Sequence, residues 1–159
     1  MAAALGHSVY AFEPSPKLIN NLKEYAREYD DKIQVVEAAA GDYCGEGELF
    51  IDAFSDDANS MILKTNAEKA EKIEVITIDA FARKERIEKI DFIKADIEGA
   101  ERAMLKGARW VLKTHKPYLS ICTYHLPDDP EVLSRIILEA NPEYTIIQKE
   151  KKLYAYVEK

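Results

Sequence analysis

The sequence is poor in cysteine and has no long apolar run. Cys44 and Cys122 form neither a CxxC pair nor an even framework, which suits a reducing compartment. No apolar run approaches the ~20 residues that are needed to cross a bilayer. The opening residues MAAALGHS lack the basic segment and the long apolar core of a secretory signal. We therefore expect a cytoplasmic protein without a transmembrane segment.

Basic residues are also in short supply. The 22 Lys and Arg residues stand against 29 Asp and Glu, for a net charge of −7. They are scattered, with no basic and aromatic stripe, so we expect no nucleic-acid partner. The GxSxG motif of serine hydrolases and the Walker phosphate loop are absent. A chain of 159 residues that is 47% hydrophobic is sufficient for one folded domain and excludes intrinsic disorder.

Short apolar runs alternate with charged helical stretches, which is typical of parallel strands joined by crossover helices. Strands are predicted at Val9–Phe12, Ile33–Ala40, Glu48–Asp52, Lys72–Asp79, Ile90–Ile97, Pro117–Thr123, Tyr144–Gln148 and Leu153–Val157. Helices are predicted at Ser15–Tyr29, Asp79–Arg86, Gly99–Leu112 and Pro130–Ala140. The sequence therefore predicts an α/β fold in a single domain over residues 1–159.

Three further features follow from local pattern. The strand at Lys72–Asp79 is predicted to pair antiparallel with Glu48–Asp52, and Asp79 to cap the helix that follows. The polar stretch Asp52–Ala70 is predicted to be a loop or lid. The charged residues Lys149–Lys152 are predicted to be the turn of a terminal antiparallel hairpin.

Polar residues follow the ends of the predicted parallel strands, where ligands bind in open α/β sheets. Glu13 ends the first strand, where its carboxylate would either accept the ribose hydroxyls of an adenosine cofactor or act as a plain cap. Asp42 follows the second strand and would either accept from an adenine amino group or serve as an ordinary turn residue.

The stretch from Asp96 to Glu101 places three acids within six residues, more than helix capping requires. We therefore expect a functional role for Asp96. His125 suits general-base chemistry because the imidazole titrates near neutrality, although a hydrogen-bonded loop histidine is the simpler alternative. Asp96, Glu98 and His125 would make a plausible metal-ligand set. No local ligand spacing supports it, so no metal site is predicted.

Five segments in order resemble the FkbM family of S-adenosylmethionine-dependent methyltransferases. They are VYAFEPSP (9–16), AAAGD (38–42), IDFIKADIEGAE (90–101), GARWVLKTHKP (107–117) and YHLPDD (124–129). The resemblance covers nearly the whole chain, and DIEGAE is its most specific part. A domain that binds NAD would share the acid after the first strand but leaves DIEGAE and YHLPDD unexplained.

The resemblance implies a Rossmann-like class I methyltransferase sheet, mostly parallel, that ends in an antiparallel hairpin. It implies S-adenosylmethionine as cofactor, with Glu13 at the ribose, Asp42 by the adenine and Asp96 near the methionine end. The implied reaction is in-line methylation of a hydroxyl oxygen on a sugar or secondary metabolite. Either His125 or Glu98 would take the proton.

One part of the family pattern is missing. Its first strand and glycine-rich cofactor loop are expected before Gly6, so the resemblance implies an N-terminally truncated, partial domain. The strands at Val9 and Ile90 would then either pair directly or keep open edges that promote self-association. The alternative function is a non-catalytic remnant that acts as a binding or interaction module.

Overall fold

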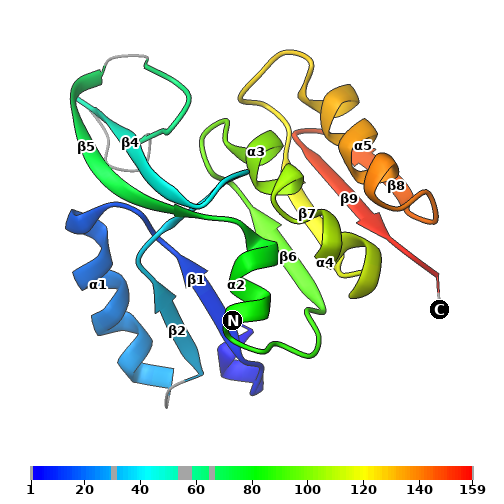
Figure 1. The fold of residues 1–159 in the computed structure, drawn as a ribbon, viewed down its shortest axis with the longest axis horizontal. Helices are drawn as coiled ribbons and strands as arrows, with labels where there is room; N and C mark the ends of the chain where they lie inside the picture. The colour runs from blue at the N-terminus through cyan, green and yellow to red at the C-terminus, as the bar shows by residue number, and fades with distance from the viewer. Residues whose placement is uncertain (1, 30–31, 54–58, 65–66, 159) are drawn as a thin grey trace.

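A computed structural model describes residues 2–29, 32–53, 59–64 and 67–158 (Figure 1). The strands are β1 (Val9–Phe12), β2 (Ile33–Val36), β3 (Ala39–Ala40), β4 (Gly45–Asp52), β5 (Ala67–Ile76), β6 (Phe92–Ala95), β7 (Tyr118–Cys122), β8 (Thr145–Lys149) and β9 (Lys152–Tyr156). The helices are η1 (Ala3–Leu5), α1 (Pro16–Ala26), η2 (Arg27–Tyr29), α2 (Ile78–Lys84), α3 (Glu101–Lys106), α4 (Arg109–Thr114) and α5 (Asp129–Ala140). None of the described helices is long and apolar enough to span a membrane.

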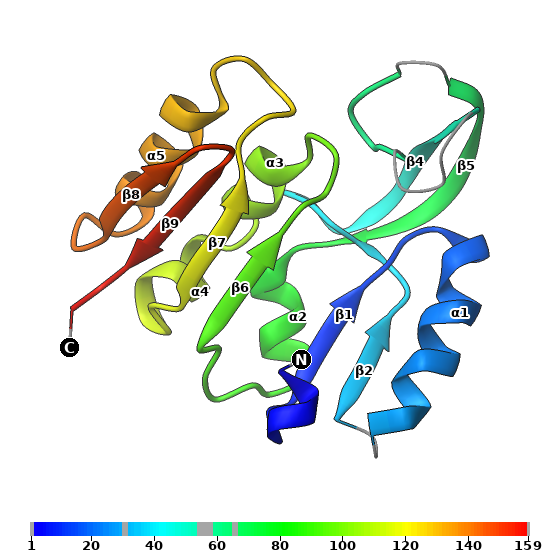
Figure 2. The same ribbon diagram turned by 180° about the vertical axis from the view of Figure 1, so that it is seen from behind.

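Within the part of the chain that the structure describes, hydrogen bonding divides the strands into three sheets. The largest has the order β6-β7-β9-β8, in which β6 and β7 are parallel and the terminal hairpin is antiparallel. β1 and β2 form a parallel pair, and β5 lies between β3 and β4. Helices α3, α4 and α5 cover one face of the largest sheet (Figures 1 and 2). The mixed α/β class and the antiparallel terminal hairpin are thus as predicted.

The strand edges at the centre of the molecule are open. β1 lies between β2 and β6 in both views (Figures 1 and 2). Among the described residues, β1 forms a hydrogen-bonded ladder only with β2, and β6 only with β7. Of the two arrangements that the sequence allowed, direct pairing of these strands is therefore wrong.

The main core lies between the largest sheet and its helices. In α5, Leu133, Ile136 and Ile137 recur at helical spacing and are buried, so one face of this helix packs on the sheet. Leu119 and Ile121 of β7 point into the same cluster. This core fixes the strand ends from which the chain leaves β6 and β7.

Two expectations about helices are wrong. The predicted helix at Gly99–Leu112 is two short helices, α3 and α4, and Gly107 lies at the break. A Cβ at Gly107 would stand 1.9 Å from the carbonyl oxygen of Gly41, so only glycine fits this close approach. Thr77, not Asp79, caps α2, because the Thr77 hydroxyl accepts from the Ala80 N–H at 3.0 Å.

Asp79 caps a different helix. Its two carboxylate oxygens accept from the Trp110 and Val111 N–H groups at 2.9 and 3.0 Å. The carboxylate thus satisfies two donors in the first turn of α4, where the helix dipole favours negative charge. With this long-range cap, α4 begins as a separate helix after the break at Gly107.

The hairpin formed by β4 and β5 is as predicted in pairing but longer. Glu48 stands opposite Lys72 in an antiparallel ladder, and the ladder extends back to Ala67. The predicted loop at 52–70 is therefore wrong for its first residue, which ends β4, and for its last four. Residues 54–58 and 65–66 of that prediction lie outside the part of the chain that the structure describes.

Candidate functional site

A cleft of about 360 Å³ opens where β1 and β6 end. The two strands end on the same side of the molecule (Figure 2), and residues that follow each of them line the cleft. The described lining includes Glu13 after β1, Asp96 and Glu98 after β6, and Ala38–Ala40 around β3. This volume lies within the range of small-molecule sites in proteins.

The predicted cofactor residues do not all meet at this cleft. Glu13 lines it, and Oε1 of Glu13 accepts from the Ser15 N–H at 2.7 Å. Asp96 also lines it. Asp42 is exposed and does not belong to the described residues that line the cleft. The structure therefore brings Glu13 and Asp96 together and leaves Asp42 apart.

Asp96 is held in place as a carboxylate by its neighbours. The Tyr124 hydroxyl donates to Oδ1 at 2.9 Å, and Lys94 Nζ lies 3.9 Å from Oδ2. Burial raises the pKa of Asp96. Hydrogen bonds from Cys122 and Tyr124 and the positive charge of Lys94 lower it by more, so the pKa lies below the ordinary value. The same hydrogen bond raises the pKa of Tyr124 to about 12. Asp96 thus carries a negative charge at neutral pH.

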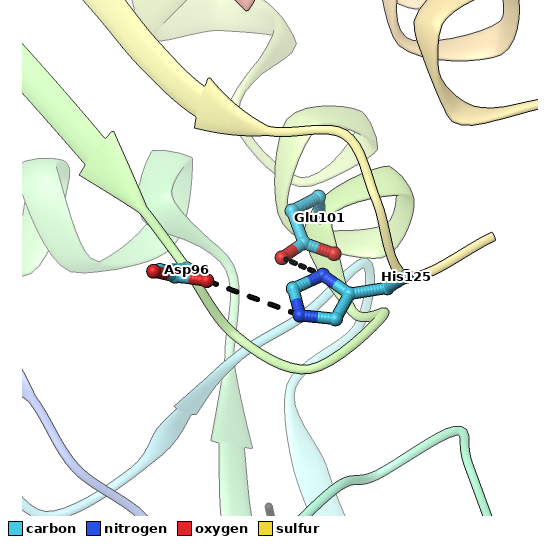
Figure 3. Close-up of side chains that lie close together, drawn as sticks. All are labelled: Asp96, Glu101 and His125. Carbon is cyan, nitrogen blue, oxygen red and sulfur yellow. Dashed lines mark ion pairs between the residues drawn. The ribbon is translucent and has the colours of Figure 1, made fainter. Parts of the chain in front are cut away.

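His125 lies among three carboxylates. Its Nδ1 is 3.1 Å from Oε1 of Glu101, and its Nε2 is 3.3 Å from Oε2 of Glu98 and 3.9 Å from Oδ1 of Asp96 (Figure 3 draws the contacts with Glu101 and Asp96). The His125 side chain is only 4% exposed. It stands behind Asp96 and Glu98 and is not part of the described cleft lining.

Glu101 is the buried member of this group. Its Oε1 accepts from the Ile97 N–H at 2.9 Å, which closes the turn between β6 and α3. Burial raises the pKa of Glu101 above the ordinary value, more than that hydrogen bond lowers it. The sequence drew attention to this residue only as the last acid of its run.

The loop that carries His125 is fixed by an ion pair that the sequence analysis missed. Arg102 donates from Nε to Oδ1 of Asp129 at 2.7 Å and from Nη2 to Oδ1 of Asp128 at 2.5 Å. The other oxygen of Asp129 accepts from the Leu126 N–H at 2.9 Å. An arginine next to the acid run and the pair of aspartates after His125 were the available signal.

A second connection ties the hairpin of β4 and β5 to the site. Ser60, which is 1% exposed, donates its hydroxyl hydrogen to the Glu98 carbonyl at 2.5 Å and accepts from the Ile62 and Leu63 N–H groups. Glu98 has a φ of +51°, in the left-handed region, so its backbone turns sharply here. The segment at 59–64 therefore helps to hold the turn that presents Glu98 to the cleft.

Comparisons with known proteins point to one family. A family model described as the methyltransferase FkbM domain matches residues 2–151. The crystal structure of methyltransferase FkbM from Methylobacillus flagellatus KT is similar, with a TM-score of 0.68 and 28% sequence identity. The match covers 94% of this chain and 36% of that one, so the chain spans about a third of the length of the solved protein. Comparison with curated proteins gave no match. The family match confirms the resemblance seen in the sequence, and the chain belongs to the FkbM methyltransferase domain family.

Proposed function

We propose that the cleft between β1 and β6 is the site of methyl transfer from S-adenosylmethionine to a hydroxyl oxygen. The observation that carries this proposal is the convergence of Glu13 with Asp96 and Glu98 on one cleft, in a chain of a methyltransferase family. We propose a hydroxyl on a sugar or secondary metabolite as the acceptor and the cytoplasm as the location.

Two carboxylates of the described lining support this choice of cofactor. The carboxylate of Glu13 would accept the ribose hydroxyls, as acids at this strand end do in related nucleotide-binding sheets. Asp96 is an anion that would pair with the ammonium group of the methionine part. Asp42 stays a predicted partner of the adenine, and its distance from the described lining makes it the weakest member of the set.

When bound, S-adenosylmethionine supplies an electrophilic methyl group on a sulfonium. The residues of the chain would hold the acceptor hydroxyl in line with the carbon–sulfur bond, because orientation provides much of the acceleration in such a reaction. A carbon–oxygen bond forms as that bond breaks, and the hydroxyl proton passes to Glu98 or His125. Glu98 lines the cleft, whereas the ring of His125 lies behind it.

Calorimetric titration of S-adenosylhomocysteine into the chain tests the cofactor site. We expect binding in the micromolar range, with Glu13→Ala weakened roughly tenfold or more through loss of the ribose contacts. Glu88→Ala removes an exposed carboxylate outside the described cleft lining and should bind as the unaltered chain does. A folded sample that gives no heat would refute the proposal.

The open edges of β1 and β6 favour a second candidate function, an interaction module. Unpaired strand edges are templates for pairing with another chain, and Phe92 on β6 is 58% exposed. On this proposal the chain self-associates through these edges. Sedimentation velocity over a hundredfold range of concentration tests it, and a monomer at every concentration would contradict it.

A further inference from the structure

Buried polar atoms without hydrogen-bond partners gather at one place in the described chain. Oε2 of Glu101 and both ring nitrogens of His125 are buried and make no hydrogen bond of acceptable geometry. Such atoms are rare in folded proteins, and each calls for an explanation, such as an ion bound at that place. The nitrogens of His125 approach carboxylates within ion-pair distance, but not along hydrogen-bond directions.

The carboxylates around the ring of His125 also favour a bound cation. Glu101 faces Nδ1, while Glu98 and Asp96 face Nε2. A neutral imidazole has one N–H, so the nitrogen that lacks the hydrogen lies close to a carboxylate that can give it no hydrogen bond. Lys94 lies beside Asp96 at 3.9 Å, and its side chain is 57% exposed, so it compensates only part of this negative charge.

We propose that Asp96, Glu101 and His125 bind a divalent cation at the carboxyl end of β6. One ligand atom from each of the three lies within 4.8 Å of the others (Figure 3). Two ligands of a tetrahedral metal with bonds of ~2.1 Å are about 3.4 Å apart, close to the 3.1 Å between Nδ1 of His125 and Oε1 of Glu101.

The donor set indicates the kind of ion. One imidazole nitrogen and several carboxylate oxygens suit Mn²⁺ and Zn²⁺, since imidazole favours zinc and carboxylates favour manganese and magnesium. The Ile97 N–H already binds Oε1 of Glu101, and this contact orients the carboxylate for its role. The Asp96 side chain is 34% exposed, which provides an entry path from the cleft.

A cation here also bears on the proton acceptor, an inference that rests on the proposed function. A metal-bound hydroxyl is more acidic than a free one, so the acceptor would become a better nucleophile at the edge of the cleft. With His125 serving as a ligand, Glu98 is the group left to take the proton.

Binding of Mn²⁺, followed by the loss of its free electron paramagnetic resonance signal, tests the site without any methyl transfer. We expect one saturable ion per chain, displaced by Zn²⁺. His125→Ala and Glu101→Gln should each weaken binding roughly tenfold or more. His7→Ala removes an exposed histidine and should leave binding unchanged.

Two results would overturn the metal site. One is the absence of saturable Mn²⁺ or Zn²⁺ binding by the folded chain. The other is equal binding by the chain and by Asp96→Asn, a partly exposed position where the substitution leaves the core intact. Binding of S-adenosylhomocysteine is measured separately, so failure of the metal site and failure of the cofactor site are distinguishable.

Discussion

Replacing Arg102 should destabilise the chain more than replacing any arginine at its surface. Arg102→Ala removes the cation that pairs with Asp129, whose side chain is 1% exposed and whose Oδ1 lies 2.7 Å from Nε of Arg102. Breaking a buried pair by deleting one partner leaves an uncompensated charge and costs about 3–5 kcal/mol. We expect the free energy of unfolding to fall by that amount.

Urea unfolding followed by circular dichroism measures this change. For a chain of this size, about 1 kcal/mol corresponds to roughly 2–4 °C in Tm. Thermal unfolding should therefore occur about 6–20 °C lower in Arg102→Ala. The variant should also bind Mn²⁺ more weakly, since the loop that carries His125 loses its anchor on α3.

Arg109→Ala is the matched control. Nη2 of Arg109 lies 3.5 Å from Oε2 of Glu139, and both side chains are more than half exposed. Such surface pairs contribute about 1 kcal/mol or less. Equal unfolding midpoints for Arg102→Ala and Arg109→Ala would refute the argument. A double variant with Asp129→Asn should lose less than the sum of the two single changes, because it removes both charges.

Three further predictions concern local structure. Asp79→Ala should lower the free energy of unfolding by about 1–2 kcal/mol in urea titrations, because the first turn of α4 loses its cap; no change would show that the cap is redundant. Gly107→Ala should reduce both soluble yield and urea midpoint, since its Cβ would overlap the Gly41 carbonyl; a midpoint like that of the unaltered chain would disprove the contact. At pH 8, iodoacetamide should modify the exposed Cys44 of the native chain but not the buried Cys122, because burial raises the pKa of Cys122 to about 11. Mass spectrometry identifies the modified residue, and modification of Cys122 before unfolding would contradict the prediction.

The strand ends were predictable because they depend on local pattern. Apolar runs that stop at Glu13 and Asp96 place both acids at the carboxyl ends of parallel strands, and topology then brings them to one cleft. Asp42 follows the same pattern, and β3 just before it does line the cleft. The Asp42 side chain is nevertheless exposed and lies outside the described lining, which the local pattern could not show.

The contacts around His125 were beyond the reach of the sequence. Glu101 is 24 residues from His125 and Arg102 is 27 residues from Asp129, by the numbering of the chain. No periodicity relates such positions; they meet only when α3 packs beside the start of α5. The cap by Asp79 is also a long-range contact that the sequence could not show, since its partners lie 31 and 32 residues away. Charge patterns marked these residues as acids or bases but did not assign their partners.

Adjacent residues of α3 both contact the segment that follows β7. Glu101 faces the ring of His125, and Arg102 binds Asp129, the first residue of α5. A rigid shift of α3 therefore moves the imidazole and the start of α5 together. Hydrogen exchange at the start of α5 should therefore change in any variant that displaces α3.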